Sequence, residues 1–488
     1  MVIESLKYKI LQQFGFAPTQ EQGQALDTFV SFLTDRDPQA VMILRGSAGT
    51  GKTSLSGAIV RTLLQIRQKV MLLAPTGRAA KVFSLGSGAP AYTIHRRIYR
   101  EKAFAGVDGQ FSLNDNLYTD TLFMVDEASM IANMGLGGTT FGSGCLLDDL
   151  VKFVYQGHND RLLLIGDKAQ LPPVGEEESP ALSASVMEGY GLKVYECDLN
   201  EVLRQSQSSG ILYNATLIRQ MITHDAVTGL PLIRFKGFAD IVMMPGAELV
   251  ESLGDSYHHV GLDETMVITR SNKRANIYNN GIRNMVLDRE EELSSGDMLM
   301  IVKNNYFWTE KEKKESGEGS AGAVPAFLAN GDRAKVLRVS NYIELYGFRF
   351  ATLQLQLPDY DDYEMQVTGM LDTLQSEAPA LTHEQQEELF RQVEEDYQHF
   401  VPLKADRMKS IRQDAYFNAL QIKYAYAVTC HKAQGGQWAH VYVDQGYMTD
   451  DMLTPDYIHW LYTAFTRATD KLFLVNWPKE QTCEPTDL

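Results

Sequence analysis

An eight-residue glycine-rich stretch carries the clearest chemical signal in the sequence. Residues 46–53 read GSAGTGKT and fit the pattern GxxxxGK[ST], with an apolar stretch before them and a helical pattern after them. In such a loop, glycines let backbone N–H groups surround phosphates, the lysine meets the phosphate charge and the hydroxyl binds Mg²⁺. We therefore predict an ATP–Mg²⁺ site formed by Gly46, Ser47, Ala48, Gly49, Thr50, Gly51, Lys52, Thr53 and Ser54.

Polar residues that suit phosphate hydrolysis follow two further apolar stretches. Asp126 and Glu127 close the segment TLFMVDE, and Gln170 lies in GDKAQLPP. A carboxylate at a strand end can hold magnesium, and its neighbour can polarise an attacking water. An amide at the end of a third strand could sense the γ-phosphate. Combined with the glycine-rich stretch, these residues favour hydrolysis of a nucleoside triphosphate.

Two arginines in the second half of the chain could complete such a site. Arg204 lies in NEVLRQS and Arg467 in LYTAFTRATDKL. Arginine stabilises a transferring phosphoryl group with its forked guanidinium. An isolated arginine is more often a surface residue. Placed across a cleft from Lys52, however, the two arginines would make the closure of two domains depend on ATP.

The stretch AVTCHKAQGGQW pairs Cys430 with His431, which raises the possibility of a nucleophile and its base. The residues before the pair are typical of a buried strand, where adjacent side chains point to opposite faces. A catalytic dyad needs both side chains within hydrogen-bonding reach. We therefore expect a buried Cys430 that faces away from His431 and takes no part in catalysis.

Alternation of apolar stretches and helical patterns predicts an α/β fold with parallel sheets covered on both faces. The first half contains apolar stretches at 40–46, 69–76, 121–127 and 161–167. A second half begins near Leu199, with core strands expected at 265–272, 424–431 and 471–476.

Two insertions interrupt this alternation. Residues 102–113 alternate in polarity around Asp108-Gly109, which predicts a β-hairpin. Short β runs with Gly-Asp and Asn-Gly turns, GDMLMIVKNNY and NGDRAKVLRV, indicate a small barrel. A helix should follow, begun by a capping box of Thr382 with Gln385 and buried along Leu389, Val393, Tyr397 and Phe400.

Charge and cysteine content narrow the function classes. The net charge is −17, but residues 359–400 hold twelve acidic residues and a single basic one. The rest of the chain is close to neutral, so a groove for DNA is allowed and a broad basic surface is not expected. Four widely spaced cysteines argue against zinc, iron–sulfur and disulfide frameworks and favour the cytoplasm. No apolar run reaches the length of a membrane helix, and the N-terminus does not read as a signal peptide.

An ordered series of motifs resembles superfamily 1 DNA helicases of the RecD-type, Pif1-like and Dda-like group, which moves 5′ to 3′. The series is PTQEQ, GSAGTGKTS, APTGRAAK, YTIHRR, VDEAS, GDKAQLPPVG, LRQ, AVTCHKAQGGQW and LYTAFTRAT. It covers nearly the whole chain in the family's order. The resemblance implies an ATP-dependent motor that moves on single-stranded DNA and opens duplex ahead of it.

The resemblance also implies an architecture of two RecA-like P-loop NTPase domains, the first with a hairpin insertion and the second with a Src-homology-3-like barrel and helices. We expect the first domain at 1–198, with its hairpin at about 96–118. The second would comprise 199–300 and 421–488, and the inserted barrel 301–420. The segment before Thr19 is too short for the N-terminal domain that docks RecD subunits to partners. The implied partners are single-stranded DNA and its junctions with duplex, bound by a monomer without a membrane.

Roles follow from the resemblance residue by residue. Gln22 corresponds to the adenine contact, Lys52 and Thr53 to nucleotide and magnesium, and Asp126 and Glu127 to magnesium and water activation. Gln170 corresponds to the γ-phosphate sensor, and Arg204 and Arg467 to the arginines of the ATP site. The positions that touch single-stranded DNA are Pro75, Thr76, Thr93, His95, Thr429 and His431. The strand-separating pin would be the hairpin, with Phe104 or Phe111 as the wedge.

The chain departs from the family at Gly436-Gln437, where RecD-type proteins commonly have Ser-Glu. A carboxylate contact to nucleotide is therefore not expected from this motif. Two alternatives remain open: a non-motor P-loop ATPase that gates binding through its nucleotide, and a helicase that acts on RNA, because contacts to the backbone do not exclude a 2′-hydroxyl. An intrinsic nuclease is disfavoured because the sequence has no second cluster of carboxylates with a strand lysine.

Overall fold

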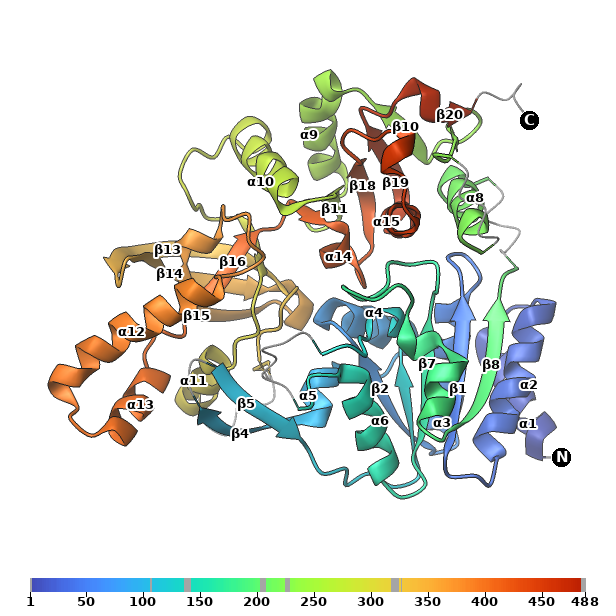
Figure 1. The fold of residues 1–488 in the computed structure, drawn as a ribbon. Coiled ribbons are helices and arrows are strands. Elements are labelled where there is room, and N and C mark those ends of the chain that lie inside the picture. The colour runs from blue at the N-terminus through green and yellow to red at the C-terminus, as the bar shows by residue number, and fades with distance from the viewer. Residues whose placement is uncertain are drawn as a thin grey trace. The chain divides into compact units, whose positions relative to one another are not determined.

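The computed structural model describes residues 2–105, 108–135, 142–201, 208–223, 229–316, 324–325 and 327–483 (Figure 1). The chain forms two compact units, each of which is described by itself. Unit 1 comprises Met1–Met244 and Ala433–Leu488, and unit 2 comprises Pro245–Lys432. The glycine-rich stretch at 135–144 lies mostly outside the described residues.

A six-stranded parallel sheet forms the centre of unit 1. Its strand order is β3-β2-β6-β7-β1-β8, and each neighbouring pair runs parallel. Four strands consist almost entirely of apolar residues, as expected for a sheet covered on both faces. The strands are β1 (Ala40–Gly46), β2 (Lys69–Ala74), β3 (Ala91–Thr93), β6 (Thr121–Val125), β7 (Arg161–Gly166) and β8 (Lys193–Leu199).

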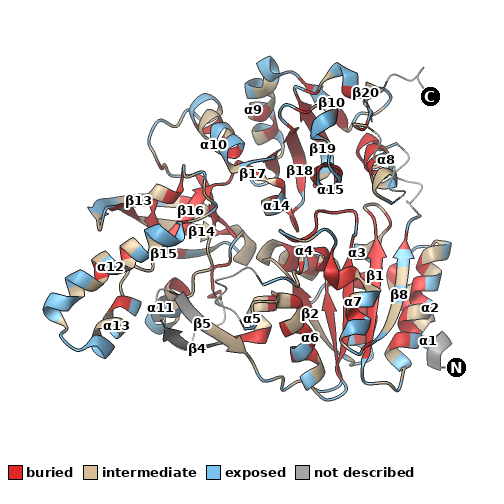
Figure 2. Ribbon diagram, viewed as in Figure 1, coloured by how far each residue is buried: buried red, intermediate tan, exposed pale blue. Residues whose placement is uncertain are grey.

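Helices cover both faces of this sheet and divide its core in two. One core joins the sheet to α1 (Val2–Phe14), α2 (Gln20–Thr34), α3 (Lys52–Gln65) and α4 (Gly77–Ser87). The other joins it to α5 (Ile94–Ile98), α6 (Leu146–Gln156) and α7 (Ala184–Gly189). Figure 2 shows the central strands buried between exposed helix faces. The carboxyl ends of β1, β6 and β7 therefore meet at one edge, where the predicted site residues follow.

The predicted hairpin is present in unit 1. Strands β4 (Tyr99–Ala105) and β5 (Asp108–Leu113) pair antiparallel, with Phe104 opposite Gly109 and a bulge between Glu101 and Ala103. Residues 106–107 at the turn lie outside the described residues.

The C-terminal part of unit 1 contributes a second set of parallel strands. β10 (Ile241–Met244), β19 (Ala468–Val475) and β18 (Trp438–Asp444) pair in that order, and β9 (Ile233–Arg234) pairs with β20 (Thr482–Cys483). Helix α15 (Pro455–Phe465) is buried along most of its length, and α8 (Gly210–Thr223) contacts it.

Unit 2 contains a closed five-stranded barrel and a pair of parallel strands. The barrel runs in the order β12 (Met298–Ile301), β13 (Arg333–Leu345), β14 (Phe348–Leu357), β15 (Tyr363–Met370) and β16 (Leu420–Tyr424). The parallel pair is β11 (Thr265–Thr269) with β17 (Ala427–Thr429). Helices of unit 2 are α9 (Leu249–His259), α10 (Asn272–Gly281), the π-helix η5 (Ile282–Val286), α11 (Phe307–Ser316), α12 (His383–Phe400), α13 (Lys404–Arg412) and α14 (Cys430–Ala433).

The predicted fold class is confirmed: two RecA-like parallel-sheet P-loop NTPase domains, with a hairpin inserted in the first and a small barrel plus helices in the second. The barrel begins three residues before the predicted insertion and ends four residues after it, because β12 and β16 close it. The predicted domain boundaries stay a prediction.

The single strand predicted at 424–431 is wrong. β16 ends at Tyr424, β17 begins at Ala427, and Cys430 starts the short helix α14. The side chain of Asn279 explains the break, since its Oδ1 accepts hydrogen bonds from the backbone N–H groups of Tyr426 (3.1 Å) and Ala427 (2.8 Å). These groups are therefore not available to continue the barrel ladder.

Candidate nucleotide site and nucleic-acid contacts

The glycine-rich residues 46–53, called the phosphate loop from here on, connect β1 to α3. Gly49 and Gly51 have φ values of 78° and 81°, which favour glycine. A Cβ atom at Gly46 would lie 2.9 Å from both Lys52 Cγ and Thr50 Oγ1, so only glycine fits where the loop closes on itself. The loop presents the start of α3, whose N-terminal amides and dipole favour an anion. The local sequence thus builds a loop whose geometry suits a phosphate group.

Lys52 and Gln22 hold this loop from two sides. The Lys52 ammonium donates to the carbonyl oxygens of Gly46 and Ser47, the latter at 3.0 Å. The buried Gln22 amide donates to the Thr50 carbonyl at 2.9 Å and accepts from the Thr19 N–H at 3.0 Å. Both atoms of the Gln22 amide are therefore engaged within the protein, where they brace the loop. Its predicted contact with adenine stays a prediction.

Asp126 and Glu127 follow β6 beside the loop. Glu127 adopts a left-handed backbone conformation (φ 53°), uncommon for a residue with a side chain, and its N–H donates to Asp126 Oδ1 at 2.9 Å. Burial and then the neighbouring Glu127 carboxylate raise the pKa of Asp126 to about 7. A divalent cation would relieve this crowding of negative charge.

The donor set fits magnesium brought in with a nucleotide. The Thr53 hydroxyl is exposed at the start of α3, and Asp126 supplies a carboxylate. Mg²⁺ prefers oxygen ligands and usually keeps phosphates and waters in its shell, so it needs few protein ligands. Within the described part of the chain, no group of three or more His, Cys, Asp or Glu side chains could hold a metal by itself.

A hydrogen-bonded chain joins Glu127 to Arg467 through Gln170. In the orientation that satisfies both amide atoms, the Gln170 nitrogen donates to Glu127 Oε2 and its oxygen accepts from Arg467 Nη2, each at 3.3 Å. Arg467 is 2% exposed and also donates to the carbonyls of Thr463 (3.1 Å) and Gly436 (3.2 Å). The structure thus brings together three of the predicted catalytic residues. Arg204, another of the predicted catalytic residues, lies outside the described residues.

Tyr462 is a site residue that sequence reasoning missed. Its hydroxyl accepts from the Ala48 N–H of the phosphate loop at 3.0 Å and donates to Asp167 Oδ2 at 2.6 Å. Burial and then the Asp167 charge raise the pKa of Tyr462, which keeps the hydroxyl protonated. A buried polar group requires a partner, and this was the available signal.

Other contacts around the loop come from α15 and α8. The Leu171 N–H donates to Thr463 Oγ1 at 2.8 Å, and Arg219 Nη1 donates to Ser47 Oγ at 2.6 Å. A cavity of about 780 Å³ adjoins the loop at Gly46 and Ser47, and Arg219 and Asp167 also line it. Arg219, like Tyr462, was not predicted.

The predicted DNA contacts in unit 1 lie at the starts of two helices. Pro75 precedes Thr76, whose hydroxyl caps α4 by accepting from the Ala79 N–H (3.2 Å). The Thr93 hydroxyl caps α5 in the same way. Burial lowers the pKa of the next candidate, His95, to about 4 against the opposing charge of Asp149. His95 is therefore neutral at physiological pH.

In unit 2, Thr429 and His431 flank Cys430 at the junction of β17 and α14. Cys430 is fully buried, His431 is exposed and Thr429 is half-buried. The prediction that Cys430 is buried is confirmed, although Cys430 begins a helix instead of continuing a strand. That it faces away from His431 stays a prediction.

Of the two wedge candidates, Phe104 and Phe111, the structure describes the side chain of Phe111. Phe111 is half-buried and packs against the core that contains α5 and α6. The side chain of Phe104 lies outside the described part of the chain. Phe111 therefore already has an apolar environment in unit 1.

The glycine turn 434–436 lies against both the 166–173 segment and α4. Gln434 Nε2 donates to the Leu171 carbonyl at 2.7 Å. Gly435, with φ 73°, approaches α4 so closely that a Cβ would lie 3.0 Å from Thr76 Oγ1. Where the family has Ser-Glu, the Gln437 carbonyl accepts from Arg78 Nη2 (2.5 Å), and Arg78 stacks over Trp438 (4.6 Å). The turn therefore lies beside Thr76, a predicted DNA contact, and bonds to Leu171, the residue after the predicted γ-phosphate sensor Gln170.

Two family models match the chain. Residues 17–229 match an AAA domain, and residues 424–475 match a UvrD-like helicase C-terminal domain. None of the helices in the described ranges combines the length and apolarity needed to cross a bilayer.

Several known proteins are similar to the chain. The ATP-dependent RecD2 DNA helicase of Deinococcus radiodurans is 30% identical over 32% of this chain and 18% of its own length. The ATP-dependent DNA helicase Dda of enterobacteria phage T4 is 25% identical over 53% of this chain and 55% of its own. The chain thus spans less than a fifth of one relative and about half of the other. A Bacteroides Pif1 helicase, solved with ADP-AlF3 and ssDNA, aligns over 96% of this chain and 95% of its own with 13% identity and a TM-score of 0.45.

Proposed function

Because the chain belongs to the superfamily 1 helicases of the RecD-like, Pif1-like and Dda-like group, we propose that it is an ATP-dependent DNA helicase. The names of two relatives, the RecD2 and Dda DNA helicases, support DNA as the substrate. The observation that carries the proposal is the chain of contacts from Glu127 through Gln170 to Arg467 beside the phosphate loop. A carboxylate, an amide and an arginine in hydrogen-bonded contact support hydrolysis of a γ-phosphate by these residues.

The proposed chemistry gives each residue its own role. Lys52 neutralises the phosphate charge, while Thr53 and Asp126 hold magnesium. Glu127 orients and deprotonates the attacking water. Arg467 stabilises charge on the transferring phosphoryl group, and Arg204 has the same proposed role. Magnesium, when bound, supplies further positive charge to the phosphates.

The proposed nucleic-acid contacts grip the backbone and read no bases. Hydroxyls and a neutral imidazole suit this role, because they can bond to phosphate or sugar oxygens without a strong field. Such contacts agree with a chain of net charge −17. We propose that Thr76, Thr93, His95, Thr429 and His431, together with the backbone at Pro75, hold single-stranded DNA.

The hairpin would meet the duplex junction, and a monomer moving 5′ to 3′ would act alone. Four widely spaced cysteines without a CxxC pair support a reducing, cytoplasmic location.

ATP hydrolysis with and without single-stranded DNA tests the proposal. We expect DNA to raise the rate at least tenfold, and Lys52→Ala to abolish the activity at an unchanged melting temperature. Lys69→Ala, which removes an exposed lysine bonded to Thr119, should match the parent protein. Hydrolysis that DNA leaves unchanged would refute a motor and favour the nucleotide-gated binding module. Stimulation by RNA alone would redirect the proposal to an RNA helicase.

A further inference from the structure

The barrel of unit 2 continues directly into the segment that carries Thr429 and His431. Barrel strand β16 ends at Tyr424, and β17 begins at Ala427. Only Ala425 and Tyr426 connect them, and both are buried. No loop therefore separates the barrel from the proposed nucleic-acid contact.

The backbone of this connection is clamped by one side chain. Asn279 Oδ1 accepts from the N–H groups of Tyr426 and Ala427. Its Nδ2 donates to the carbonyl oxygens of Ala427 (2.9 Å) and Tyr424 (3.4 Å). Asn279 is 2% exposed and belongs to α10, which packs on β11 and β17. The connection is thus fixed to the parallel pair.

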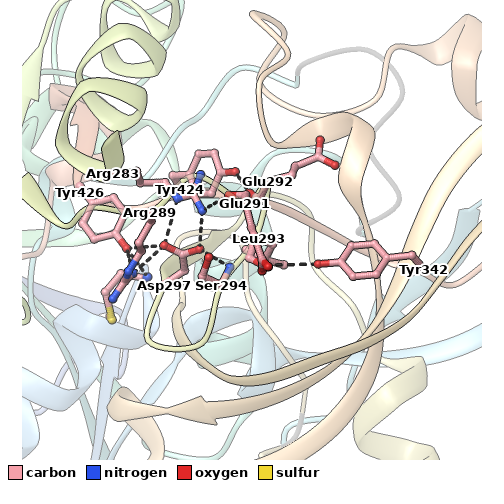
Figure 3. Close-up of polar contacts among 11 residues, drawn as sticks. Arg283, Arg289, Glu291, Glu292, Leu293, Ser294, Asp297, Tyr342, Tyr424 and Tyr426 are labelled. Atoms are coloured by element: carbon pink, nitrogen blue, oxygen red, sulfur yellow. Dashed lines mark hydrogen bonds and ion pairs between the residues drawn. The ribbon is translucent and has the colours of Figure 1, made fainter. Parts of the chain in front are cut away.

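The side chain of Tyr426 is hydrogen-bonded to the barrel. Its hydroxyl donates to Asp297 Oδ1 at 2.7 Å, and the Met298 N–H donates to the same hydroxyl at 3.1 Å. Asp297 immediately precedes β12, and its carbonyl accepts from the Val336 N–H of β13. Tyr426 therefore ties the connection to the first two barrel strands (Figure 3).

Two arginines surround the Asp297 carboxylate, which is completely buried. Arg283, from the π-helix η5, donates to Oδ1 and Oδ2 at 3.0 Å each. Arg289 Nη1 lies 2.6 Å from Asp297 Oδ1 and 2.6 Å from the Tyr426 hydroxyl. The Ser294 N–H also donates to Asp297 Oδ2, at 2.7 Å. Figure 3 shows these side chains converging on one carboxylate.

Hydrogen bonds between buried charged and polar groups are directional, and a displaced partner leaves an uncompensated charge. Burial and then the Asp297 charge raise the pKa of Tyr426, so its hydroxyl remains a donor. Buried hydrogen bonds therefore join the barrel, α10 and β17 through Tyr426 and Asn279.

We propose that Tyr426 is a positioning residue that transmits force on the barrel to the nucleic-acid contact at Thr429 and His431. Force on the barrel reaches these residues through the Asp297 network and the Asn279 clamp. The inference rests on the proposed helicase function. It gives the barrel a mechanical role, because the barrel couples strand separation to each ATP hydrolysed and takes no part in the hydrolysis itself.

Tyr426→Phe tests this inference because it keeps the ring and removes only the hydroxyl. The measurement is the number of base pairs opened per ATP hydrolysed on forked DNA, with ATPase recorded at saturating single-stranded DNA. We expect base pairs per ATP to fall at least fivefold and the saturated ATPase rate to stay within twofold of the parent protein. Tyr346→Phe is the matched control, since its hydroxyl donates to Asp396 away from the connection. It should match the parent protein in both quantities.

Arg289→Met provides a second variant if Tyr426→Phe folds poorly. It removes a donor from the same hydroxyl and carboxylate, while Arg283 still neutralises Asp297. We expect the same selective loss, and the double variant should lose no more than the worse single variant, because both act through one network.

Three results would overturn the inference. Unchanged base pairs per ATP in Tyr426→Phe would show that the hydroxyl transmits nothing. A proportional loss of ATPase and unwinding would show a structural role alone. In both cases the parent protein still unwinds, and the proposed function stands. If the parent protein opens no duplex at all, the proposed function fails and this inference fails with it.

Discussion

At the scale of single residues, the nucleotide site combines groups that are local in the sequence with groups from its far end. Lys52, Asp126 and Gln170 could be predicted because each follows a recognisable strand. Tyr462 and Arg219 could not, because their partners in the phosphate loop are 414 and 172 residues away. Packing decides which buried polar side chain bonds to each unpaired N–H group. These pairings cannot be read from the residues next to either partner in the sequence.

Tyr462→Phe should weaken ATP turnover. The change leaves the Ala48 N–H and an Asp167 oxygen without their partner, and an unsatisfied buried group costs about 1–3 kcal/mol. We expect kcat/KM for ATP to fall about tenfold, as steady-state ATPase would measure.

A matched control for this change lies on the same helix. Tyr457 is also buried in α15, but its hydroxyl donates to Gln445, away from the loop. Tyr457→Phe should leave kcat/KM for ATP unchanged. Equal losses in the two variants would mean that Tyr462 only stabilises the helix.

His95 should contribute to DNA binding without contributing charge. Its pKa of about 4 lies below the usual value of 6.5, so the ring stays neutral from pH 8 down to about pH 5. Each phosphate neutralised by a cation adds about 0.7 to the salt slope for single strands. His95→Gln should therefore leave unchanged the slope of log Kd for single-stranded DNA against log salt at pH 7. A slope reduced by about 0.7 would show a charged imidazole.

At the scale of elements, the sequence predicts which helices and strands exist better than it predicts where each of them ends. The capping box of Thr382 with Gln385 begins α12 as predicted, and Leu389 and Val393 are buried. Phe400, the last apolar position of the same pattern, is 83% exposed. Periodicity fails there because a helix end leaves the surface it packs on. The prediction of one strand at 424–431 failed for another reason. The side chain of Asn279 accepts hydrogen bonds from backbone N–H groups of this segment, which interrupts the strand.

Phe111 should act as a packing residue of the hairpin. It is half-buried against the core of unit 1, so Phe111→Ala should lower the free energy of unfolding by about 1–2 kcal/mol. Leu117→Ala, at a position 88% exposed, should change it by less than about 0.5 kcal/mol. Chemical denaturation measures both. A variant with intact stability that opens less duplex per ATP would instead identify Phe111 as the wedge.

At the scale of the whole molecule, net charge is a poor guide to the partner. Much of the −17 lies in residues 359–400, and α12 places acids such as Glu384, Glu387 and Glu395 on its exposed side. The α/β class, the hairpin and the barrel were predictable because each has its own pattern of apolar residues and turns. The extent of each compact unit was not, since it depends on contacts between distant segments.

The central claim is that ATP hydrolysis at the phosphate loop drives movement along single-stranded DNA. Strand separation on forked DNA, with either a 5′ or a 3′ single-stranded tail, tests this claim most directly. We predict that ATP and Mg²⁺ will support opening of the 5′-tailed duplex, that the 3′-tailed duplex will stay closed, and that Lys52→Ala will open neither. ATP-independent opening, or a parent protein that opens neither duplex while hydrolysing ATP, would contradict the account.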